Sequence, residues 1–249
     1  MIKVGLIGYG KAGAAVARVI DADERFELCW IARRSACPTD TGHPVTGLAA
    51  DSFPAWLDQH PVDAVIDFSD AEAVLIYGEA IRRRGIALVS AISSYPETTL
   101  AYIRELGKDI RVMSSPNITL GINFLMFAAR MLRRIAPFAD VEILEQHFRD
   151  KPEVSGTARK IAENLDVDHE RITSLRLGGI VGHHEVIFGF PFQTVRLIHD
   201  SIRREAFGTG AAFALNELLK YPPGLYSYDD LLLNLIRQDL NGSLAPAHA

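Results

Sequence analysis

The feature that most constrains the fold lies at the start of the chain, where a short apolar run meets a cluster of glycines. Ile2–Ile7 has the β-branched character of a strand, Gly8–Gly13 reads GYGKAG, and residues 14–22 follow a helical pattern. In this setting G-x-G-x-x-G predicts a dinucleotide-binding loop, because the glycines permit a tight turn, close approach of a pyrophosphate and close packing of the helix. The helix N-terminus adds unpaired N–H groups for the phosphates. The predicted cofactor residues of this loop are Gly8, Tyr9, Gly10, Lys11, Ala12 and Gly13.

Strands and helices then alternate along the first half of the chain. Strands are predicted at 62–68, 87–90 and 111–113, with helices at 71–84 and 96–107 between them. This order favours a doubly wound parallel sheet, in which ligands bind beyond the carboxyl ends of the strands. Loops are polar in most proteins, so their residue types add little weight of their own. The loop residues expected to face the cofactor are Asp67, Phe68, Ser69, Ala91, Ser93, Ser115, Pro116 and Asn117.

The end of the second predicted strand, Phe26–Ala32, indicates which dinucleotide is bound. It is followed by Arg33, Arg34 and Ser35 and by no acid. An acid at this place binds the ribose 2′-hydroxyl of NAD, whereas guanidinium groups match a 2′-phosphate. Arg33 and Arg34 are therefore predicted cofactor residues, with NADPH as the predicted cofactor and NADH as the alternative. The competing interpretation is that both arginines are solvated loop residues.

The second half of the chain has a different pattern. Helices are predicted over 121–135 and from Ser155 or Gly156 to Leu165, and strands over 140–145, 172–177, 185–190 and 194–201. Consecutive strands of this kind indicate a separate mixed sheet that is able to pair with other copies of itself. Two last helices, over 210–219 and 228–240, are expected to return to the first domain.

The expected fold class is therefore α/β, with two domains. An N-terminal Rossmann-type doubly wound parallel sheet is joined by a C-terminal α+β domain with a mostly antiparallel or mixed sheet. The predicted boundaries are 1–118 with 206–249 for the dinucleotide-binding domain, and 119–205 for a substrate-binding and oligomerisation domain.

The stretch EQHFRDKPEVSGTA, residues 145–158, contains the candidate catalytic residues. His147 and Lys151 lie four apart, and Ser155-Gly156-Thr157 follows at the start of a predicted helix. A helix N-terminus with flanking hydroxyls and a nearby ammonium predicts a site for an anionic small molecule. The alternatives are an ordinary helix N-cap and a structural histidine. A cap and an anion site are compatible, so the first alternative does not exclude the function.

The composition favours a small-molecule partner over nucleic acid or a membrane. The 249-residue chain has a formal charge of −5, and its one basic run, Arg82–Arg84, lies in a helical pattern. No apolar run approaches the roughly 20 residues of a membrane span, and the N-terminus lacks a signal-peptide layout. Cys29 and Cys37 give no disulfide framework or metal-ligand spacing, and His183 and His184 would point to opposite faces of a strand. No metal site is predicted, and a cytoplasmic location is expected.

The sequence as a whole resembles the dihydrodipicolinate reductase family. The resemblance rests on GYGKAG at 8–13, DFS at 67–69, SPNITLGIN at 115–123, E-x-H-x-x-x-K with SGTA at 145–158, RLGGIVGHHEVIF at 176–188, and H-x-x-x-x-R-x-x-F-x-x-G at 199–210. It implies an NAD(P)H-dependent enzyme of bacterial lysine and diaminopimelate synthesis. It also implies a homotetramer joined through the C-terminal sheet.

The resemblance implies roles for single residues. His147 resembles the histidine that donates a proton or orients the substrate, and Lys151 resembles its partner lysine. Ser155, Gly156 and Thr157 resemble the loop that grips a substrate carboxylate. The expected substrate is a small cyclic dicarboxylate with an imine or enamine bond, which would accept a hydride from the nicotinamide while His147 supplies a proton or hydrogen-bonds the ring nitrogen.

Three departures from the family pattern surround this site. Phe148 replaces a second histidine, and the segment from Lys151 to Ser155 is one residue shorter, without a proline directly before the serine. The usual Gly-Thr-Thr-Gly loop becomes Ala91-Ile92-Ser93-Ser94, in which Ser93 keeps a hydroxyl for the substrate side. Two alternatives therefore stay open: a reductase of the same build that acts on another carboxylated imine or enamine, and a non-catalytic nucleotide-binding regulator.

Overall fold

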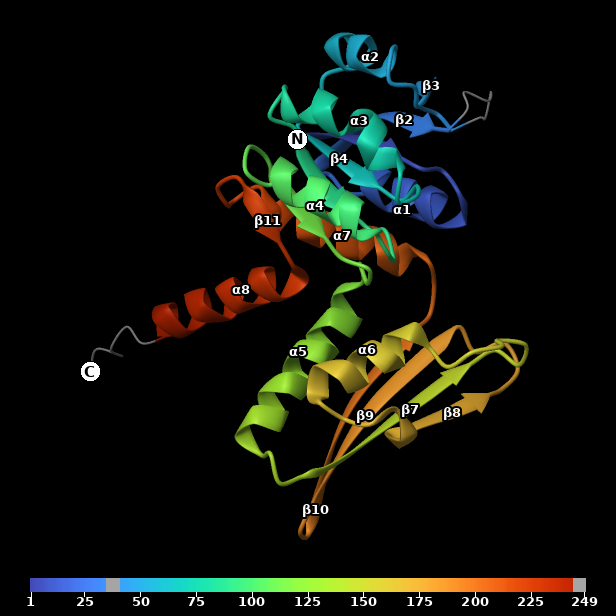
Figure 1. Cartoon of the computed structure of the whole chain (residues 1–249), viewed down its shortest axis with the longest axis vertical. Helices are drawn as coiled ribbons and strands as arrows, with labels where there is room; N and C mark the ends of the chain where they lie inside the picture. The colour runs from blue at the N-terminus through green and yellow to red at the C-terminus, as the bar shows by residue number, and fades with distance from the viewer. Residues whose placement is uncertain (35–40, 244–249) are drawn as a thin grey trace. The chain divides into compact units, whose positions relative to one another are not determined.

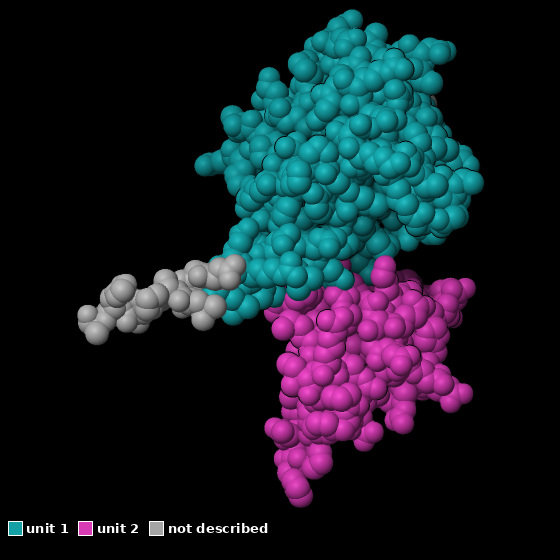
Figure 2. All heavy atoms as spheres, turned by 60° about the vertical axis from the view of Figure 1, so that its left-hand side comes forward, with its two compact units in different colours: residues 1–119, 207–249 teal, residues 120–206 magenta. Residues whose placement is uncertain are grey.

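The computed structural model describes residues 1–34 and 41–243, so that Ser35 and Cys37 lie outside the described residues. The chain divides into two compact units, which Figure 2 shows in different colours. Unit 1 comprises Met1–Thr119 with Phe207–Ala249, and unit 2 comprises Leu120–Ala206.

Within the described residues, unit 1 contains a seven-stranded parallel sheet with the strand order β11-β6-β5-β4-β1-β2-β3 (Figure 1). The strands are β1 (Ile2–Ile7), β2 (Phe26–Arg33), β3 (Val45–Gly47), β4 (Ala64–Asp67), β5 (Ala87–Ser90), β6 (Arg111–Ser114) and β11 (Gly224–Tyr226). The order runs outward in both directions from the neighbouring pair β1 and β4. Such a reversal creates a switch point, and ligands bind in the crevice at its carboxyl end.

Helices pack against this sheet because its central strands are apolar on both faces. Every residue of β4 and β5 is buried, as expected of parallel strands covered on two sides. Trp30, Phe53 and Tyr77 are fully buried in one core cluster, with edge-on ring contacts at centroid distances of 5.6 and 6.5 Å. The helices are α1 (Lys11–Asp21), α2 (Phe53–Gln59), α3 (Ala73–Arg82), α4 (Glu97–Leu106), α7 (Glu205–Leu218) and α8 (Tyr228–Ser243).

Unit 2 has a four-stranded sheet in the order β10-β9-β7-β8, with two helices on one face (Figure 1). Its elements are α5 (Leu120–Ile135), β7 (Asp140–His147), α6 (Gly156–Leu165), the 3-10 helix η1 (His169–Arg171), β8 (Ile172–Arg176), β9 (Gly182–Phe190) and β10 (Gln193–Ser201). β7 and β8 are parallel, and the other neighbours are antiparallel. Ile143, Phe188 and Ile161 belong to the core between the sheet and these helices.

The predicted fold class, a Rossmann-type parallel sheet plus a second mixed sheet, is confirmed. Three elements of unit 1 were not predicted: β3, α2 and β11. Each of these strands has 3 residues and the helix has 7, so none is long enough to show a hydrophobic period. β11 adds a segment from the end of the chain to the edge of the first sheet, beside β6.

No helix within the described residues combines the length and the apolar character that a membrane span requires.

Candidate functional site

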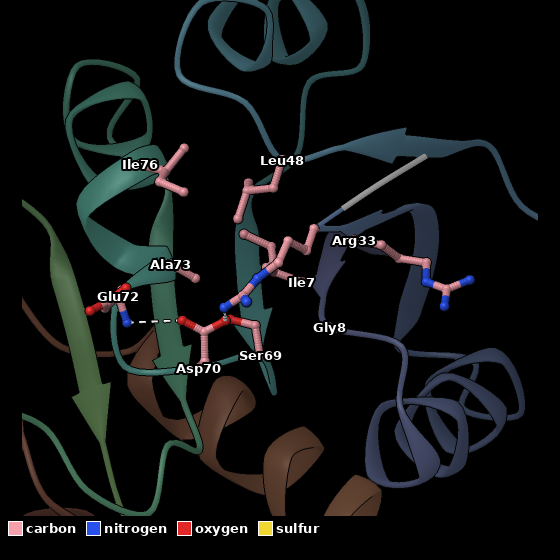
Figure 3. A pocket seen from close by; sticks show the side chains of 10 residues that line it. Ile7, Gly8, Arg33, Leu48, Ser69, Asp70, Glu72, Ala73 and Ile76 are labelled. Carbon is pink, nitrogen blue, oxygen red and sulfur yellow. Dashed lines mark hydrogen bonds and ion pairs between the residues drawn. The ribbon is translucent and has the colours of Figure 1, made fainter. Parts of the chain in front are cut away.

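A pocket of about 300 Å³ lies in unit 1 where the carboxyl ends of β1, β2 and β4 meet (Figure 3). Ile7 pairs with Asp67 across β1 and β4, and the Phe68 N–H donates to the Ile7 carbonyl at 2.8 Å. The pocket is therefore at the switch point of the sheet, where dinucleotides bind in such folds. Its lining residues are Ile7, Gly8, Arg33, Arg34, Leu48, Ser69, Asp70, Glu72, Ala73 and Ile76.

The glycines of the Gly8–Gly13 loop have three different reasons to lack a side chain. Gly8 has a φ of +89°, and a Cβ there would lie 2.6 Å from the backbone of Phe68 and Ser69. A Cβ on Gly13 would lie 2.0 Å from the Gly8 carbonyl oxygen, so this glycine lets α1 approach the loop. A Cβ on Gly10 would meet nothing within 4 Å, which leaves open space beside the α1 N-terminus.

The open space at Gly10 is what a pyrophosphate requires, because phosphates bind against the backbone N–H groups of a helix N-terminus. Gly10 is the N-cap of α1, and no side chain caps this end. Tyr9 and Ala12 are half-buried in the same loop, whereas Lys11 is exposed. The loop predicted to bind the cofactor thus fits that group.

Asp67 was predicted to face the cofactor, but its side chain turns away from the pocket. It is fully buried, and one oxygen accepts hydrogen bonds from the Ser69 N–H at 2.8 Å and the Ser69 hydroxyl at 2.5 Å. The other oxygen accepts from the Tyr77 hydroxyl at 2.6 Å. Burial raises the pKa of Asp67 against the effect of these bonds. The Asp67 carboxyl group therefore holds the turn that places Ser69 on the pocket wall.

Arg33, the last residue of β2, and Arg34, which follows it, have different surroundings. Arg34 forms an ion pair with Asp70 at 2.6 Å, from the end of β2 to the loop after β4. The other Asp70 oxygen accepts from the Glu72 N–H at 3.0 Å. In Figure 3 the Arg33 side chain extends away from Asp70 and Ser69. The sequence predicted both arginines as site residues but gave no sign that an acid from another loop would join them.

The other predicted cofactor loops follow β5 and β6 at the same edge of the sheet. Ala91 is half-buried and donates its N–H to the Asp67 carbonyl at 2.9 Å, and Ser93 is exposed. Ser115 is buried and donates its hydroxyl to the Asn117 carbonyl at 2.6 Å, which leaves Pro116 exposed. These loops stand beside the β4 loop without lining the pocket itself.

In unit 2 the end of β7 carries a buried ionic group in place of apolar residues. Alternate residues of β7 are buried, and the last two of them are Glu145, at 0% exposure, and His147, at 8%. The Glu145 carboxylate lies 2.5 Å from Nδ1 of His147. It also accepts from the Ser174 hydroxyl at 2.7 Å and from the Ser155 N–H at 3.2 Å.

Arg176, at the end of β8, forms the ion pair of this cluster. Its guanidinium group donates to both Glu145 oxygens, at 2.8 and 3.0 Å. Burial by itself raises the pKa of Glu145, but hydrogen bonds from Arg176, Ser174 and His147 outweigh it and lower the pKa to about 2. The carboxylate is therefore ionised at neutral pH, and it accepts hydrogen bonds without donating any.

The Ser155-Gly156-Thr157 sequence begins α6, as predicted. Ser155 is the N-cap, and its buried hydroxyl accepts from the Ala158 N–H at 3.4 Å and lies 2.8 Å from Nε2 of His184. The backbone N–H of Ser155 donates to Glu145, and its hydroxyl contacts His184 and Ala158, so this residue anchors the helix start inside unit 2. Gly156 is exposed, with nothing within 4 Å of a Cβ built on it. Thr157 is half-buried in the same turn.

Lys151 lies between β7 and α6 and is half-buried. Its ammonium group makes no hydrogen bond or ion pair with any other part of residues 1–34 and 41–243. The structure thus brings His147, Lys151 and the α6 N-terminus to one end of unit 2, on segments that Glu145 and Arg176 connect.

Two further histidines border this cluster. His184 pairs with Glu145 across β7 and β9, and with His199 across β9 and β10. Its ring meets the His147 ring edge-on at 5.3 Å. Burial, together with the neighbouring His147 and His199, lowers the pKa of His184 to about 3, so that its ring is neutral at physiological pH. His183 faces the other side of the sheet, where Nδ1 lies 2.7 Å from Asp200.

Sequence reasoning missed Glu145, Arg176, His184 and Asp70 as parts of these sites. A signal existed for Glu145, which is two residues before His147 and therefore on the same face of a strand. Arg176 and His184 come from other strands, and their pairing with β7 is not written in local sequence. Within the described residues no group of three or more His, Cys, Asp or Glu side chains is arranged to hold a metal ion.

Comparisons with known proteins match both units. The family described as dihydrodipicolinate reductase, N-terminus, matches residues 2–118, and the one described as dihydrodipicolinate reductase, C-terminus, matches residues 118–232. The 4-hydroxy-tetrahydrodipicolinate reductase of Caldanaerobacter subterraneus subsp. tengcongensis is 30% identical, over 90% of this chain and 94% of that protein. The protein of the same name from Myxococcus xanthus is 31% identical, over 86% and 88%.

Among solved structures, the dipicolinate-bound dihydrodipicolinate reductase from Paenisporosarcina sp. TG-14 superposes with a TM-score of 0.77. The match covers 91% of this chain and 97% of that one, at 23% identity, so this likeness shows the shared fold.

Proposed function

Because the chain belongs to the dihydrodipicolinate reductase family, we propose that it catalyses the NAD(P)H-dependent reduction of 4-hydroxy-tetrahydrodipicolinate (dihydrodipicolinate) to tetrahydrodipicolinate in lysine and diaminopimelate synthesis. The observation that carries this proposal is the arrangement at the end of β7. There His147, held through Nδ1 by a buried carboxylate, belongs to the same cluster as the start of α6, with Lys151 on the segment between. A dicarboxylate substrate that also gains a proton would use the lysine and the helix start to bind its charge and the histidine to supply the proton.

The cofactor is assigned to unit 1. Gly10 and the first turn of α1 would hold the pyrophosphate, because the space beside Gly10 is open and the helix N-terminus attracts negative charge. Ser69 lines the same pocket and would contact the adenosine end of the cofactor. The bound nicotinamide supplies the hydride, and the chain supplies binding and orientation.

NADPH is the proposed preference over NADH. Arg33 and Arg34 line the pocket at the end of β2, where no acid directly follows the strand. A guanidinium group matches a 2′-phosphate with paired donors. Asp70 is the opposing element, since its carboxylate faces the same pocket and is paired with Arg34. The balance between the Arg34 and Asp70 charges would set how strongly the 2′-phosphate is preferred.

The substrate is assigned to unit 2. One carboxylate would bind the Lys151 ammonium and the exposed start of α6 at Gly156, where the helix dipole and the first-turn N–H groups favour an anion. Thr157 lies in this turn and would add its hydroxyl. Ser155 positions the turn through its bonds to Glu145 and His184.

Loss of the 4-hydroxyl group as water converts 4-hydroxy-tetrahydrodipicolinate into dihydrodipicolinate, and the reduction then adds a hydride to an electron-poor ring carbon and a proton to balance it. His147 keeps its Nδ1 proton on Glu145, so Nε2 is the ring atom left for the substrate. In the doubly protonated imidazolium form Nε2 carries a proton, which it would donate to the substrate or use to hydrogen-bond the ring nitrogen. Such a group contributes about a hundredfold or more when it is correctly placed. Lys151 and Gly156 would neutralise the charge of the substrate and hold its ring in the reactive orientation.

A homo-oligomer, with a tetramer as the expected size, is proposed from the uncovered face of the unit 2 sheet. Leu175, Leu177 and Ile198 are 39%, 50% and 55% exposed. Leu175 and Ile198 lie on the face opposite α5 and α6, because they alternate along their strands with residues that face these helices. Light scattering of the purified full chain measures the assembly directly.

The test is an assay with freshly prepared dihydrodipicolinate that follows NADPH absorbance. Turnover that pyridine-2,6-dicarboxylate inhibits competitively is the expected result. Phe148 is 43% exposed beside His147 and favours one second candidate, a reductase of another carboxylated imine. Turnover of such an imine alone would establish that candidate. Cofactor binding without turnover of any imine would instead support a non-catalytic nucleotide-binding regulator.

A further inference from the structure

The segment that carries Lys151 belongs to no helix or strand. Residues 148–154 connect β7 to α6, and the Arg149 N–H donates to the Gly178 carbonyl at 3.1 Å near the start of this segment. The Lys151 N–H donates to the Phe148 carbonyl at 3.1 Å. Further along, the carbonyl oxygens of Lys151 and Glu153 both accept from the Arg176 side chain. The placement of Lys151 therefore depends on Arg176.

Arg176 uses every one of its five side-chain N–H groups. Nε donates to the Lys151 carbonyl at 3.0 Å. Nη1 donates to a Glu145 oxygen at 3.0 Å and to the Leu175 carbonyl at 2.9 Å. Nη2 donates to the other Glu145 oxygen at 2.8 Å and to the Glu153 carbonyl at 2.7 Å. One planar group thus joins β7, β8 and the Lys151 segment in a fixed geometry.

Glu145 connects the same guanidinium group to His147. Its side chain is fully buried, and Oε2 lies between Nη1 of Arg176 and Nδ1 of His147. Because an ionised carboxylate only accepts hydrogen bonds, Nδ1 of His147 carries the proton. The ring is then held in one tautomer when neutral, with Nε2 left for the substrate. A hydrogen bond on one ring nitrogen commonly fixes the state of the other in this way.

Resting on the function proposed above, we propose that Glu145 and Arg176 are positioning residues for the reduction. Glu145 fixes the tautomer and orientation of His147, and Arg176 ties the Lys151 segment to the same carboxylate. A single ion pair thereby sets the spacing between the proton-donating group and the carboxylate-binding group.

The competing explanation is an ordinary buried ion pair that only stabilises unit 2. The two explanations differ in what a lysine at position 176 would do. A lysine keeps the positive charge near Glu145, but its single ammonium group cannot reach five acceptors in one plane. Stability would change modestly, whereas the carbonyl oxygens of Lys151 and Glu153 would lose their donor.

The first experiment compares Arg176→Lys with the control Arg171→Lys. Arg171 precedes β8 in the same unit, but its side chain is 60% exposed and its ion pair with Glu142 is long, at 3.9 Å. Arg176→Lys is expected to lower kcat/KM for the dicarboxylate by about a hundredfold, since misplacement by about 1 Å costs that much. The KM for NADPH and the kinetics of the control should stay at the wild-type values. Guanidinium ion should raise the activity of Arg176→Ala and leave the wild type unchanged.

The second experiment does not depend on turnover. Nitrogen NMR of the full chain, with imidazole-labelled histidine, is expected to show His147 in the Nδ1–H form. Arg176→Lys should keep that form and should be cut by trypsin after Arg149 faster than the wild type or Arg171→Lys. Glu145→Gln should keep cofactor binding in unit 1, which shows that the chain is folded, and should lose the single tautomer.

These readouts separate failure of this inference from failure of the proposed function. A wild-type His147 in the Nε2–H form, or equal trypsin rates in all three proteins, would overturn the inference whatever the substrate is. A correct tautomer and faster cleavage in a protein without reductase activity would retain the positioning roles and reject the reaction. If Glu145→Gln does not fold, the wild-type tautomer and the Arg176→Lys cleavage rate still decide.

Discussion

In unit 1 the proposed cofactor site is made largely of backbone, whereas in unit 2 the proposed substrate site is held in place by charged side chains around a buried carboxylate, Glu145. Gly8, Gly10 and Gly13 matter because they have no side chain, and the ion pair between Arg34 and Asp70 at the pocket is exposed on both sides. Glu145, by contrast, is fully buried, and each of its oxygens has at least two partners.

This difference has a consequence for how each site responds to change. A backbone site tolerates most side-chain substitutions but not an added Cβ, because the ligand or a neighbouring peptide occupies that space. A buried ionic site is sensitive to the loss of any partner, since the remaining charge is then left without compensation. An added side-chain atom should therefore weaken the cofactor site by blocking the space for the ligand. The substrate site should be weakened when a charged group is removed or shifted.

The largest expected effect is that of Lys151→Ala. Removing the ammonium group should lower kcat/KM for the dicarboxylate by about a hundredfold to a thousandfold, as is typical when one group that stabilises charge in a transition state is removed. NADPH affinity, measured by titration calorimetry, should stay at the wild-type value, because Lys151 belongs to unit 2. Lys160→Ala, on α6, is the control and should be active. Equal loss of cofactor affinity in Lys151→Ala would contradict the division of roles between the two units.

The glycines give the next effect. Gly10→Ala adds a methyl group to open space, so its thermal midpoint without cofactor should match the wild type. That methyl group would crowd the pyrophosphate, and overpacking of about 1–3 kcal/mol corresponds to roughly a fivefold to hundredfold weaker Kd for NADPH. Gly13→Ala is the matched comparison, because its Cβ would lie 2.0 Å from the Gly8 carbonyl oxygen. It should lower the thermal midpoint as well. Identical midpoints for the two variants would refute this assignment.

The pH dependence of stability tests the buried character of unit 2. The pKa of His184 is about 3 in the folded protein, against 6.5 as the ordinary value. Below pH 6.5 the His184 ring therefore binds a proton in the unfolded chain but not in the folded chain. The free energy of unfolding then falls as the pH decreases, until about pH 3. Each pH unit in this window costs up to about 1.4 kcal/mol.

Urea midpoints between pH 6.5 and 4.5 measure this slope. The range stops at pH 4.5, the ordinary pKa of Glu145, because protonation of that carboxylate in the unfolded chain dominates at lower pH. A loss of about 2 kcal/mol across that interval is expected for the wild type. His184→Gln should have a shallower slope, because the neutral side chain takes up no proton in either state. His169→Gln removes a histidine that is 54% exposed and should keep the wild-type slope. Parallel slopes for both variants would place the titration elsewhere.

The fold was predictable from sequence where the pattern is local. Ile2–Ile7, the glycine loop and α1 follow one another along the chain, and each has its own period or motif. β3 and β11, with 3 residues each, carry too few positions for a period, and their places depend on the sheet edges that they join. Length therefore explains these two omissions.

The sites were predictable in part for the same reason. His147, Lys151 and Ser155 lie within nine residues of one another, so their grouping was visible in the sequence. Arg176 is 31 residues from Glu145, and Asp70 is 36 residues from Arg34. Only the pairing of β7 with β8, and of β1 with both β2 and β4, brings those partners together. The buried partners of Asp67 and Ser155, which include Tyr77 and His184, also come from other segments of the chain and are not visible in the local sequence.

The smallest expected effect concerns the exposed pair in the cofactor pocket. Arg34 is 82% exposed and Asp70 is 42% exposed, and such surface pairs are typically worth about 0–1 kcal/mol. Asp70→Asn removes a negative charge near the proposed 2′-phosphate and releases Arg34, so the ratio of kcat/KM for NADPH to that for NADH should rise by about fivefold. Calorimetric Kd values for NADP⁺ and NAD⁺ should change in the same direction, and Arg34→Ala should move both ratios the opposite way. Asp58→Asn, which affects the ion pair with Arg84 instead, is the control. Because the Asp70 pair is exposed and the Glu145 pair is buried, a larger effect at Asp70 than at Arg176 would reverse the contrast between the two regions.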